Sequence, residues 1–318
     1  MITTVVGNYP KIGDTPEKSI LRESLHRMDR GEITEAQMHE IARKVTKEVI
    51  EEQVSAGIDI VTDGQILWED EVTYFAKALE GIELNGLVRF FDTNTYYRQP
   101  VIKGKIEWKR SALSEDFSFA KSVSKKQVKA VIPGPYTLAN LSINKCYKKM
   151  GDVVGDFAAA IKKEARALVS AGARMIQLNE PAITRKPEDF GILEDAVGEI
   201  CEVKADWGIM LYFGDYRPLY KKLVSLPVNI IGLDVFNYGI PKDFPEDKVL
   251  CAGLVDARNT KLEDWEWLGE KIRKLLSIVE SERLHVSPNC GLEFLPRETA
   301  FVKLRNMVRV VRNVEKGG

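Results

Sequence analysis

A single-domain (β/α)8 barrel spanning residues 1–318, with a β-hairpin inserted after its second strand, is the fold that the sequence predicts. Eight short apolar runs recur along the 318 residues, and longer amphipathic stretches separate most of them. Strands that alternate with helices form parallel sheets, and eight such units in about 300 residues fit a closed barrel. The first run is not followed by GxGxxG, the fingerprint of the doubly wound dinucleotide-binding alternative.

The eight predicted strands are rich in β-branched residues, and most end in a small or polar residue. They are "TTVVGN" (3–8), "IDIVTDG" (58–64), "VKAVIPG" (128–134), "ARMIQLNE" (173–180), "GIMLYFGD" (208–215), "VNIIGLD" (228–234), "KVLCAGLVD" (248–256) and "RLHVSPNC" (283–290). Two of the intervening stretches, residues 35–57 and 152–172, have apolar positions at helical spacing and end in glycine. We therefore expect Gly57 and Gly172 to terminate helices that precede strands.

Residues 86–125 depart from this alternation. The stretch "GLVRFFDTNTYYRQPVIKGKIEWKR" is aromatic, strand-like and interrupted by a turn, so it predicts a β-hairpin inserted after the second strand, at the C-terminal face of the barrel. An ordinary structural elaboration explains this segment equally well. A ligand-facing role is favoured only by one polar cluster, Arg89, Asp92, Asn94, Tyr96 and Arg98.

Composition excludes several classes of protein. The net charge is −1, so no long-range field attracts nucleic acid or an anionic membrane. No apolar run approaches the length of a membrane span, and the first residues do not have the pattern of a signal peptide. The four cysteines are widely separated and form no CxxC pair, so no disulfide framework is expected. These features predict a cytoplasmic protein.

The polar residues that close the predicted strands define a candidate site, because barrel enzymes bind ligands at the carboxyl ends of their strands. Each of these residues alone could equally be a helix cap or a loop residue. The set is Asn8, Asp63, Gly134 with Tyr136, Asn179 with Glu180, Tyr212 with Asp215, Asp234, Asp256 and Cys290.

The sequence does not supply a complete zinc site. Zinc takes three or four Cys, His, Asp or Glu ligands, often in closely spaced pairs. The three histidines, at positions 26, 39 and 285, are in none of the spacings HxC, HxxxH or HExxH. Cys290 with Asp234 and Asp256 would form at most a weak, oxygen-rich site.

Several motifs together resemble the cobalamin-independent methionine synthase family along nearly the whole chain. They are "VVGNYPKIGD", "AGIDIVTDG", "GPYTLANLS", "IQLNEPAI" and "SPNCGL", in the order and spacing of that family. Full-length members are two tandem barrels. The C-terminal barrel holds a zinc ion that activates homocysteine, and the N-terminal barrel helps to hold polyglutamylated folate. The resemblance therefore implies a barrel fold and a methyltransferase.

The chain departs from the catalytic barrel at its ligand positions. The His-x-Cys of the fifth strand is replaced by Met210-Leu211-Tyr212, and the glutamate of the sixth strand by Asp234, so only Cys290 remains. A substrate-binding aspartate is replaced by Asn179, and two glutamates are replaced by Gln65 and Arg185.

Other stretches resemble the N-terminal, zinc-lacking barrel. They are "FFDTNTYYRQP", "LYFGDY" and "AGLVDARN". The basic residue that in the family holds the glutamate tail of folate corresponds to Arg89. A second basic contact on the first helix corresponds to Lys18.

The resemblance implies a component of methionine synthesis that positions a methyl donor alongside a separate zinc-bearing barrel. The donor would be a methyl-folate or a methyl-corrinoid, the substrate-binding candidates are Arg89, Lys18, Asn179, Glu180 and Asp234, and no catalytic residue is assigned. Two alternatives stay open. One is an autonomous methyltransferase in which Cys290, Asp234 and tyrosines form an unorthodox metal site. The other is a non-catalytic barrel that binds a pterin, an amino acid or a corrinoid protein.

Overall fold

The computed structural model describes residues 1–13, 15 and 19–317, which form two compact units. Unit 1 comprises Met1–Leu67, Phe119–Val128 and Ala252–Gly318, and unit 2 comprises Trp68–Ser118 and Lys129–Cys251. Each of the eight predicted strand runs overlaps an observed strand, although the strands at Ile2–Thr3 and Asp206–Leu211 begin before the predicted runs, and most of the segments between these runs contain helices. An α/β fold with parallel strands is thereby confirmed. Across the described ranges, no helix has both the length and the apolar composition that crossing a bilayer requires.

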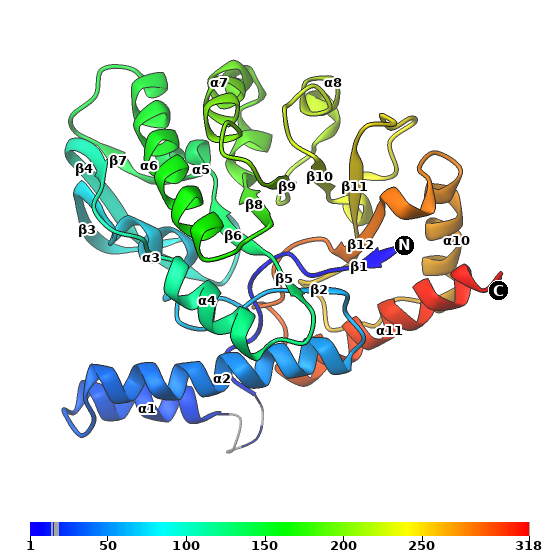
Figure 1. Cartoon of the computed structure of the whole chain (residues 1–318), viewed down its shortest axis with the longest axis horizontal. Coiled ribbons are helices and arrows are strands. Elements are labelled where there is room, and N and C mark those ends of the chain that lie inside the picture. Colours follow the sequence, from blue (N-terminus) through cyan, green and yellow to red (C-terminus); the bar gives the residue numbers. More distant parts are fainter. Residues whose placement is uncertain (14, 16–18, 318) are drawn as a thin grey trace. The chain divides into compact units, whose positions relative to one another are not determined.

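Unit 1 contains the two ends of the chain (Figure 1). Its strands are β1 (Ile2–Thr3), β2 (Ile60–Val61), β5 (Gln127–Val128) and β12 (Leu284–Pro288). Its helices are α1 (Ile20–Asp29), α2 (Glu35–Ser55), α10 (Trp265–Leu276), α11 (Arg297–Glu315) and the 3₁₀ helix η5 (Ser281–Arg283). Strand β1 pairs in parallel with β12, β2 pairs in parallel with β5, and Thr4 forms a parallel bridge to Ile60.

Unit 2 is built on four parallel strands in the order β10-β9-β8-β6. Their bounds are β6 (Ala130–Pro133), β8 (Met175–Asn179), β9 (Asp206–Leu211) and β10 (Ile230–Leu233). Its α-helices are α3 (Glu71–Ala76), α5 (Pro135–Leu141), α6 (Met150–Ser170), α7 (Phe190–Ile200), α8 (Tyr220–Leu223) and α9 (Val235–Tyr238). Its 3₁₀ helices are η2 (Pro181–Arg185), η3 (Pro187–Asp189) and η4 (Arg217–Leu219). Helices α6 and α7 pack side by side (Figure 1). Strand β11 (Val249–Val255) and helix α4 (Ser114–Val123) have residues in both units.

The two glycines expected to terminate helices do so. Gly57 follows α2 with φ 93° and Gly172 follows α6 with φ 90°, a backbone conformation that glycine adopts without steric cost. Helix α2 begins with a capping box, in which the side chains of Thr34 and Gln37 each accept a hydrogen bond from the other residue's backbone N–H. Local sequence therefore determines both ends of this helix.

The hairpin forms with different bounds from those predicted. Strands β3 (Leu79–Arg89) and β4 (Tyr96–Trp108) pair antiparallel, and β4 also pairs in parallel with β7 (Ile143–Asn144). The hairpin thus begins at residue 79 instead of 86, and residues 114–123 form helix α4 instead of a strand. The chain turns away from the sheet because buried Glu164 binds the segment after β4. Its carboxylate accepts the indole N–H of Trp108, the hydroxyl of Ser111 and the backbone N–H of Leu113.

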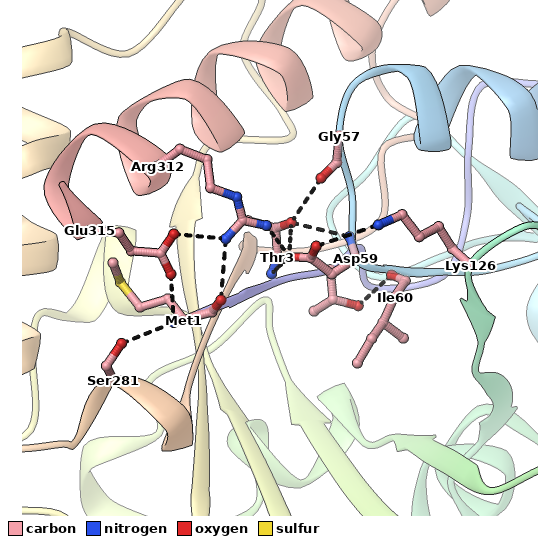
Figure 2. A network of polar contacts seen from close by, with 10 residues as sticks. Met1, Thr3, Gly57, Asp59, Ile60, Lys126, Ser281, Arg312 and Glu315 are labelled. Atoms are coloured by element: carbon pink, nitrogen blue, oxygen red, sulfur yellow. Dashed lines mark hydrogen bonds and ion pairs between the residues drawn. The ribbon is translucent and has the colours of Figure 1, made fainter.

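A polar cluster in unit 1 fastens the start of β1 to helix α11 (Figure 2). The carboxylate of Asp59, which precedes β2, accepts hydrogen bonds from the Thr3 backbone N–H at 2.9 Å and the Thr3 hydroxyl at 2.8 Å. The guanidinium of Arg312 binds the same carboxylate and also Glu315. Burial alone would raise the pKa of Asp59, but the hydrogen bonds from Thr3 and Arg312 hold it below its ordinary value.

We expect the Arg312→Met substitution to lower the free energy of unfolding by about 1 kcal/mol, since both members of the pair are partly exposed. Chemical denaturation at pH 7 measures this difference. The folded-state pKa of Asp59 is depressed, so its contribution is present above the unfolded-state pKa and is lost on acidification. The matched control is Arg309→Met, which removes an exposed arginine from the same helix. Equal stabilities of the two variants would contradict the role of the cluster.

Candidate active site

The carboxyl ends of the parallel strands in unit 2 carry several of the predicted site residues. Asn179 is the last residue of β8, Tyr212 follows the last residue of β9, and Asp234 follows the last residue of β10. Parallel register aligns these ends, because Asn179 pairs with Met210 and Leu233 pairs with Leu211. Asn179, Tyr212 and Asp234 are all buried.

A chain of hydrogen bonds between buried side chains leads to Asn179. The ammonium group of Lys129 donates to Gln177 Oε1 at 2.6 Å, and Gln177 Nε2 donates to Asn179 Oδ1 at 2.8 Å. Asn179 Nδ2 then donates to Glu71 Oε1 at 2.5 Å, and the hydroxyl of Tyr212 donates to Glu71 Oε2 at 3.3 Å. All five side chains are buried, so water cannot substitute for these contacts.

The direction of this chain follows from the groups at its two ends. A lysine ammonium can only donate, so Gln177 must present its carbonyl oxygen to Lys129 and its NH2 group to Asn179. Asn179 must then turn its own NH2 group toward Glu71, which accepts as a carboxylate. The chemistry of the two ends therefore assigns the orientation of both amides.

Burial lowers the pKa of Lys129 to about 8. This residue lies one position before β6, in a run that is otherwise apolar. A buried charge costs several kcal/mol unless other groups compensate it. Here the charge of Lys129 is stabilised by the amide dipoles of Gln177 and Asn179. The hydrogen bonds of these two amides end at the carboxylate of Glu71.

Glu180 is buried and holds the beginning of helix α5. Its Oε1 accepts the backbone N–H of Tyr136 at 2.8 Å, and its Oε2 accepts the backbone N–H of Thr137 at 2.9 Å and the Thr137 hydroxyl at 2.7 Å. A Cβ at Gly134 would lie 2.1 Å from Glu180 Oε1, so glycine is required at this position. Burial raises the pKa of Glu180 to about 8, and the charge of Glu71 adds to this shift.

Asp234 has a similar local role at the end of β10. Its carboxylate accepts the backbone N–H of Asn237 at 3.0 Å and the Asn237 side-chain amide at 2.7 Å, and so caps helix α9. Glu180 therefore holds the segment that follows the neighbouring strand β6, and Asp234 holds the segment that follows its own strand β10. Their predicted contact with substrate stays a prediction.

Aromatic rings connect the hairpin tip to the end of β9. Phe213, at φ 63°, packs against Phe90 and Phe91 with ring centroids 6.3 and 5.6 Å apart. Arg185 stacks over Phe91 at 4.8 Å and forms an ion pair with Asp92. A positive φ is costly for phenylalanine, so these contacts must hold the backbone at this point. The hairpin tip is thus fixed beside Tyr212.

Arg89, the last residue of β3, is exposed and lies opposite Tyr96. The ion pair that holds the turn is made by Arg185 with Asp92, and Arg89 finds no ion-pair partner within the described ranges. Its guanidinium therefore faces solvent on the hairpin. Lys18, the other predicted basic contact, lies outside the described residues.

Cys290 is in unit 1, at the end of β12, where it is buried and its thiol donates to the Gly291 carbonyl at 3.6 Å. In the same unit Asn8 donates to Glu293 Oε1 at 3.1 Å, and burial raises the pKa of Glu293 to about 7. Gln65 is buried at φ 54°, and neither polar atom of its side chain has a partner among the described residues.

The residues do not fit a zinc site. No group of three or more His, Cys, Asp or Glu side chains within residues 1–13, 15 and 19–317 is arranged to hold a metal ion. The positions that carry metal ligands in the resembled catalytic barrel are used differently here. Tyr212 binds Glu71, Asp234 caps α9, and Met210 fills the space above Gly232, where a Cβ would lie 2.0 Å from its sulfur.

Sequence reasoning did not find Glu71, Gln177 or Lys129. Glu71 lies in "WEDEVTYF", which indicates only the start of a helix, and its partner Asn179 is 108 positions away. Lys129 did leave a signal, since it is the one charged residue in the run "VKAVIPG". A lone lysine inside a predicted buried strand calls for a polar partner in the interior.

Comparisons with known proteins give a consistent result. The family model described as "Cobalamin-independent synthase, Catalytic domain" matches residues 1–197 and 222–313. A methionine synthase from Saccharolobus solfataricus is 36% identical over 98% of this chain and 94% of its own length. One from Sulfolobus acidocaldarius is 36% identical over 96% of this chain and 90% of its own length. A solved structure of a B12-independent methionine synthase from a Shewanella species, in complex with selenomethionine, has a TM-score of 0.86 at 22% identity and covers 99% of this chain and 98% of its own.

We expect the stability contribution of Lys129 to depend on pH with a defined sign. Its folded-state pKa, about 8, lies below the ordinary value near 10.4, so this contribution is present above pH 10 and is lost as pH falls to 8. The wild type should therefore lose about 2–4 kcal/mol relative to Lys129→Met between pH 10 and pH 7. Chemical denaturation of both proteins across this range tests the expectation. A pH-independent difference would show that the folded-state pKa of Lys129 is not lowered from its ordinary value.

Proposed function

Because the chain belongs to the cobalamin-independent methionine synthase family, we propose that it is a component of methionine synthesis that positions a methyl donor alongside a separate zinc-bearing barrel. The family assignment confirms the class predicted from the sequence, a methyltransferase of the methionine synthase type. In the proposed reaction the methyl group leaves its donor and bonds to the sulfur of homocysteine, which must first lose its thiol proton.

The proposal rests on the contacts that the side chains at the strand ends make within the protein. Thiol alkylation proceeds through a thiolate, because the thiol is a weak nucleophile. In the described chain, Tyr212 and Asp234 are bound to neighbouring protein groups, and no three potential metal ligands converge. These contacts favour a role in binding and orienting reactants, with thiol activation supplied by the partner barrel.

The proposal includes a closed fold. We take the eight parallel strand runs to form a single (β/α)8 domain over residues 1–318, with the β3–β4 hairpin inserted after the second run. The parallel pairs β1–β12, β6–β8, β8–β9 and β9–β10 support this arrangement. In such a fold, the carboxyl ends of the strands form the binding face.

The methyl donor belongs, in this proposal, on the hairpin side of unit 2. Arg89 presents a guanidinium on the hairpin, and a guanidinium can bind a carboxylate in a bidentate fork. A methyl-folate with an anionic glutamate tail fits this chemistry, and a methyl-corrinoid is the other donor considered. Lys18 is proposed as a second cation for the same tail. Asn179, Glu180 and Asp234 are proposed on the side of the thiol substrate.

A reconstitution assay tests the function. Methionine formation is measured with homocysteine and methyl-folate for this protein alone, for a zinc-bearing single barrel alone, and for both together. We expect turnover to rise at least about tenfold in the mixture, and the purified protein to contain well under one equivalent of zinc. Full turnover by this protein alone, with stoichiometric zinc that is lost in Cys290→Ala, would instead establish an autonomous enzyme.

The Arg89→Ala substitution tests the donor site. Loss of a charged hydrogen-bonding group should weaken binding of a polyglutamylated folate by about 1–3 kcal/mol. This loss should shrink at high salt, because screening already weakens the wild-type contact. Calorimetric titration at two salt concentrations measures both effects. The control is Arg110→Ala, which removes an exposed arginine beyond the other end of β4. Equal affinities of wild type and Arg89→Ala would remove Arg89 from the donor site.

A further inference from the structure

We propose that Asn85 is a site of spontaneous deamidation, in which the backbone nitrogen of Gly86 attacks the side-chain amide and expels ammonia. The two residues form the single Asn-Gly pair of the 318-residue sequence, and they lie in strand β3 of the hairpin. The products are aspartate and isoaspartate at position 85. The modification itself does not depend on the proposed function, and only its effect on donor binding rests on it.

The backbone pairing of the hairpin is irregular at these two residues. Leu84 pairs with Pro100 on β4. The next registered pair is Leu87 with Arg98, so two residues of β3 lie opposite one residue of β4. Such a bulge leaves its extra residue outside the regular ladder. The order of the sheet is β3-β4-β7, so the outer side of β3 is paired with none of the described strands.

Few contacts restrain the reacting groups. Asn85 and Gly86 are both exposed, and the side-chain amide of Asn85 makes no hydrogen bond to any described residue. A Cβ added at Gly86 would have no heavy atom of a neighbouring segment within 4 Å. Glycine itself has no β-carbon to hinder the approach of its nitrogen to the amide carbon. Water and the attacking nitrogen can therefore both reach this amide.

The pair Asp63–Gly64 in unit 1 shows how the fold protects a similar dipeptide. The carboxylate of Asp63 accepts the backbone N–H of Gln65 at 3.0 Å. The backbone N–H of Gly64, the group that would have to attack, donates to the hydroxyl of Thr62 at 3.2 Å. Both reacting groups are thus held apart by hydrogen bonds to neighbouring residues. The pair in β3 has no comparable side-chain contacts in the part of the chain that the structure describes.

Water is the only other reactant that the modification needs. The Gly86 nitrogen loses its proton and bonds to Cγ of Asn85, while the bond from Cγ to the amide nitrogen breaks and ammonia leaves with that proton. The product is a cyclic imide. Water then opens the imide at Cγ, which gives aspartate, or at the backbone carbonyl carbon, which gives isoaspartate.

The two products differ in their effect on the hairpin. Both add a negative charge at position 85, four residues before Arg89 in the sequence. That separation is roughly 10–13 Å along a strand, which exceeds the Debye length of about 8 Å at physiological salt, so the charge acts weakly on Arg89. Isoaspartate also adds a methylene group to the backbone. This longer backbone shifts the following residues against β4, including the arginine of the proposed donor site.

Mass spectrometry of aged protein tests the modification. The folded protein is incubated in mildly alkaline buffer and digested with trypsin, which yields residues 78–89 and 90–98 as separate peptides. The first contains Asn85 as its only side-chain amide. The second contains only Asn94, an exposed asparagine of the same hairpin that is followed by threonine. A sample taken before incubation corrects for deamidation during digestion.

We expect the peptide with Asn85 to gain the mass difference between OH and NH2 at least about tenfold faster than the peptide with Asn94, because threonine hinders the attack and glycine does not. Fragmentation of the product peptide should show both aspartate and isoaspartate. Equal rates for the two peptides, or aspartate without isoaspartate, would overturn the inference.

The matched variant is Gly86→Ala. The structure has room for the added methyl group, and the φ of Gly86 lies outside the left-handed range, so the variant should fold as the wild type does. We expect it to slow the loss of ammonia from Asn85 at least about tenfold. An unchanged rate in the folded variant would contradict the role of Gly86. The comparison of the two wild-type peptides decides the inference if this variant folds poorly.

Titration with a polyglutamylated folate separates the effect of charge from that of the backbone. At physiological salt we expect Asn85→Asp to bind within about twofold of the wild type, and protein enriched in isoaspartate to bind several-fold more weakly. Equal affinities of enriched and fresh protein would contradict the shift of the hairpin tip. If fresh wild type binds no folate, the proposed donor site fails and this effect fails with it, whereas the peptide masses still decide the deamidation.

Discussion

The hydrogen bond from the Asn179 amide to the Glu71 carboxylate is the contact on which the candidate site depends. It joins the end of strand β8 to helix α3, and α3 is itself bonded to β4 of the hairpin through Thr73. A buried carboxylate must be given donors, because burial without them costs several kcal/mol. This requirement also sets the orientation of the amides in the chain of hydrogen bonds. Gln177 and Asn179 both turn their NH2 groups toward Glu71, because the ammonium group of Lys129 donates to the carbonyl oxygen of Gln177 at the other end.

The two compact units use charge differently. In unit 1 the Asp59 cluster lies at the beginnings of β1 and β2, is partly exposed, and ties elements at the start of the chain to the last helix. In unit 2 the buried acids Glu180 and Asp234 follow the ends of strands β8 and β10, whereas buried Lys129 precedes the start of β6. The buried charges of unit 2 create a strong electrostatic field at the candidate site, and their burial costs folding free energy.

Much of the architecture could be predicted from sequence because its signals are local. Each of the eight apolar runs overlaps an observed strand, and the glycines at 57 and 172 marked the ends of two long helices. The predicted bounds of the hairpin, residues 86–125, were wrong at both ends, because the local sequence there is not typical of the structure that forms. Residues 79–85 contain Gly81 and two glutamates, residue types that are unusual in strands, yet they pair along β4 through bulges. Residues 114–123 are aromatic like a strand but form a helix beyond the segment that Glu164 holds.

The site was less predictable, because its decisive contacts join distant positions. Strand ends indicated Asn179, Glu180 and Asp234, but no local pattern shows that Glu180 and Asp234 hold neighbouring loops or that Asn179 binds Glu71. A crystal structure with methionine bound tests the central claim most directly. The account predicts that the Asn179 amide donates to the Glu71 carboxylate and that the Lys129 ammonium donates to Gln177, with the ligand present. An Asn179 amide turned away from Glu71, or a Lys129 ammonium outside hydrogen-bonding distance of Gln177, would contradict it.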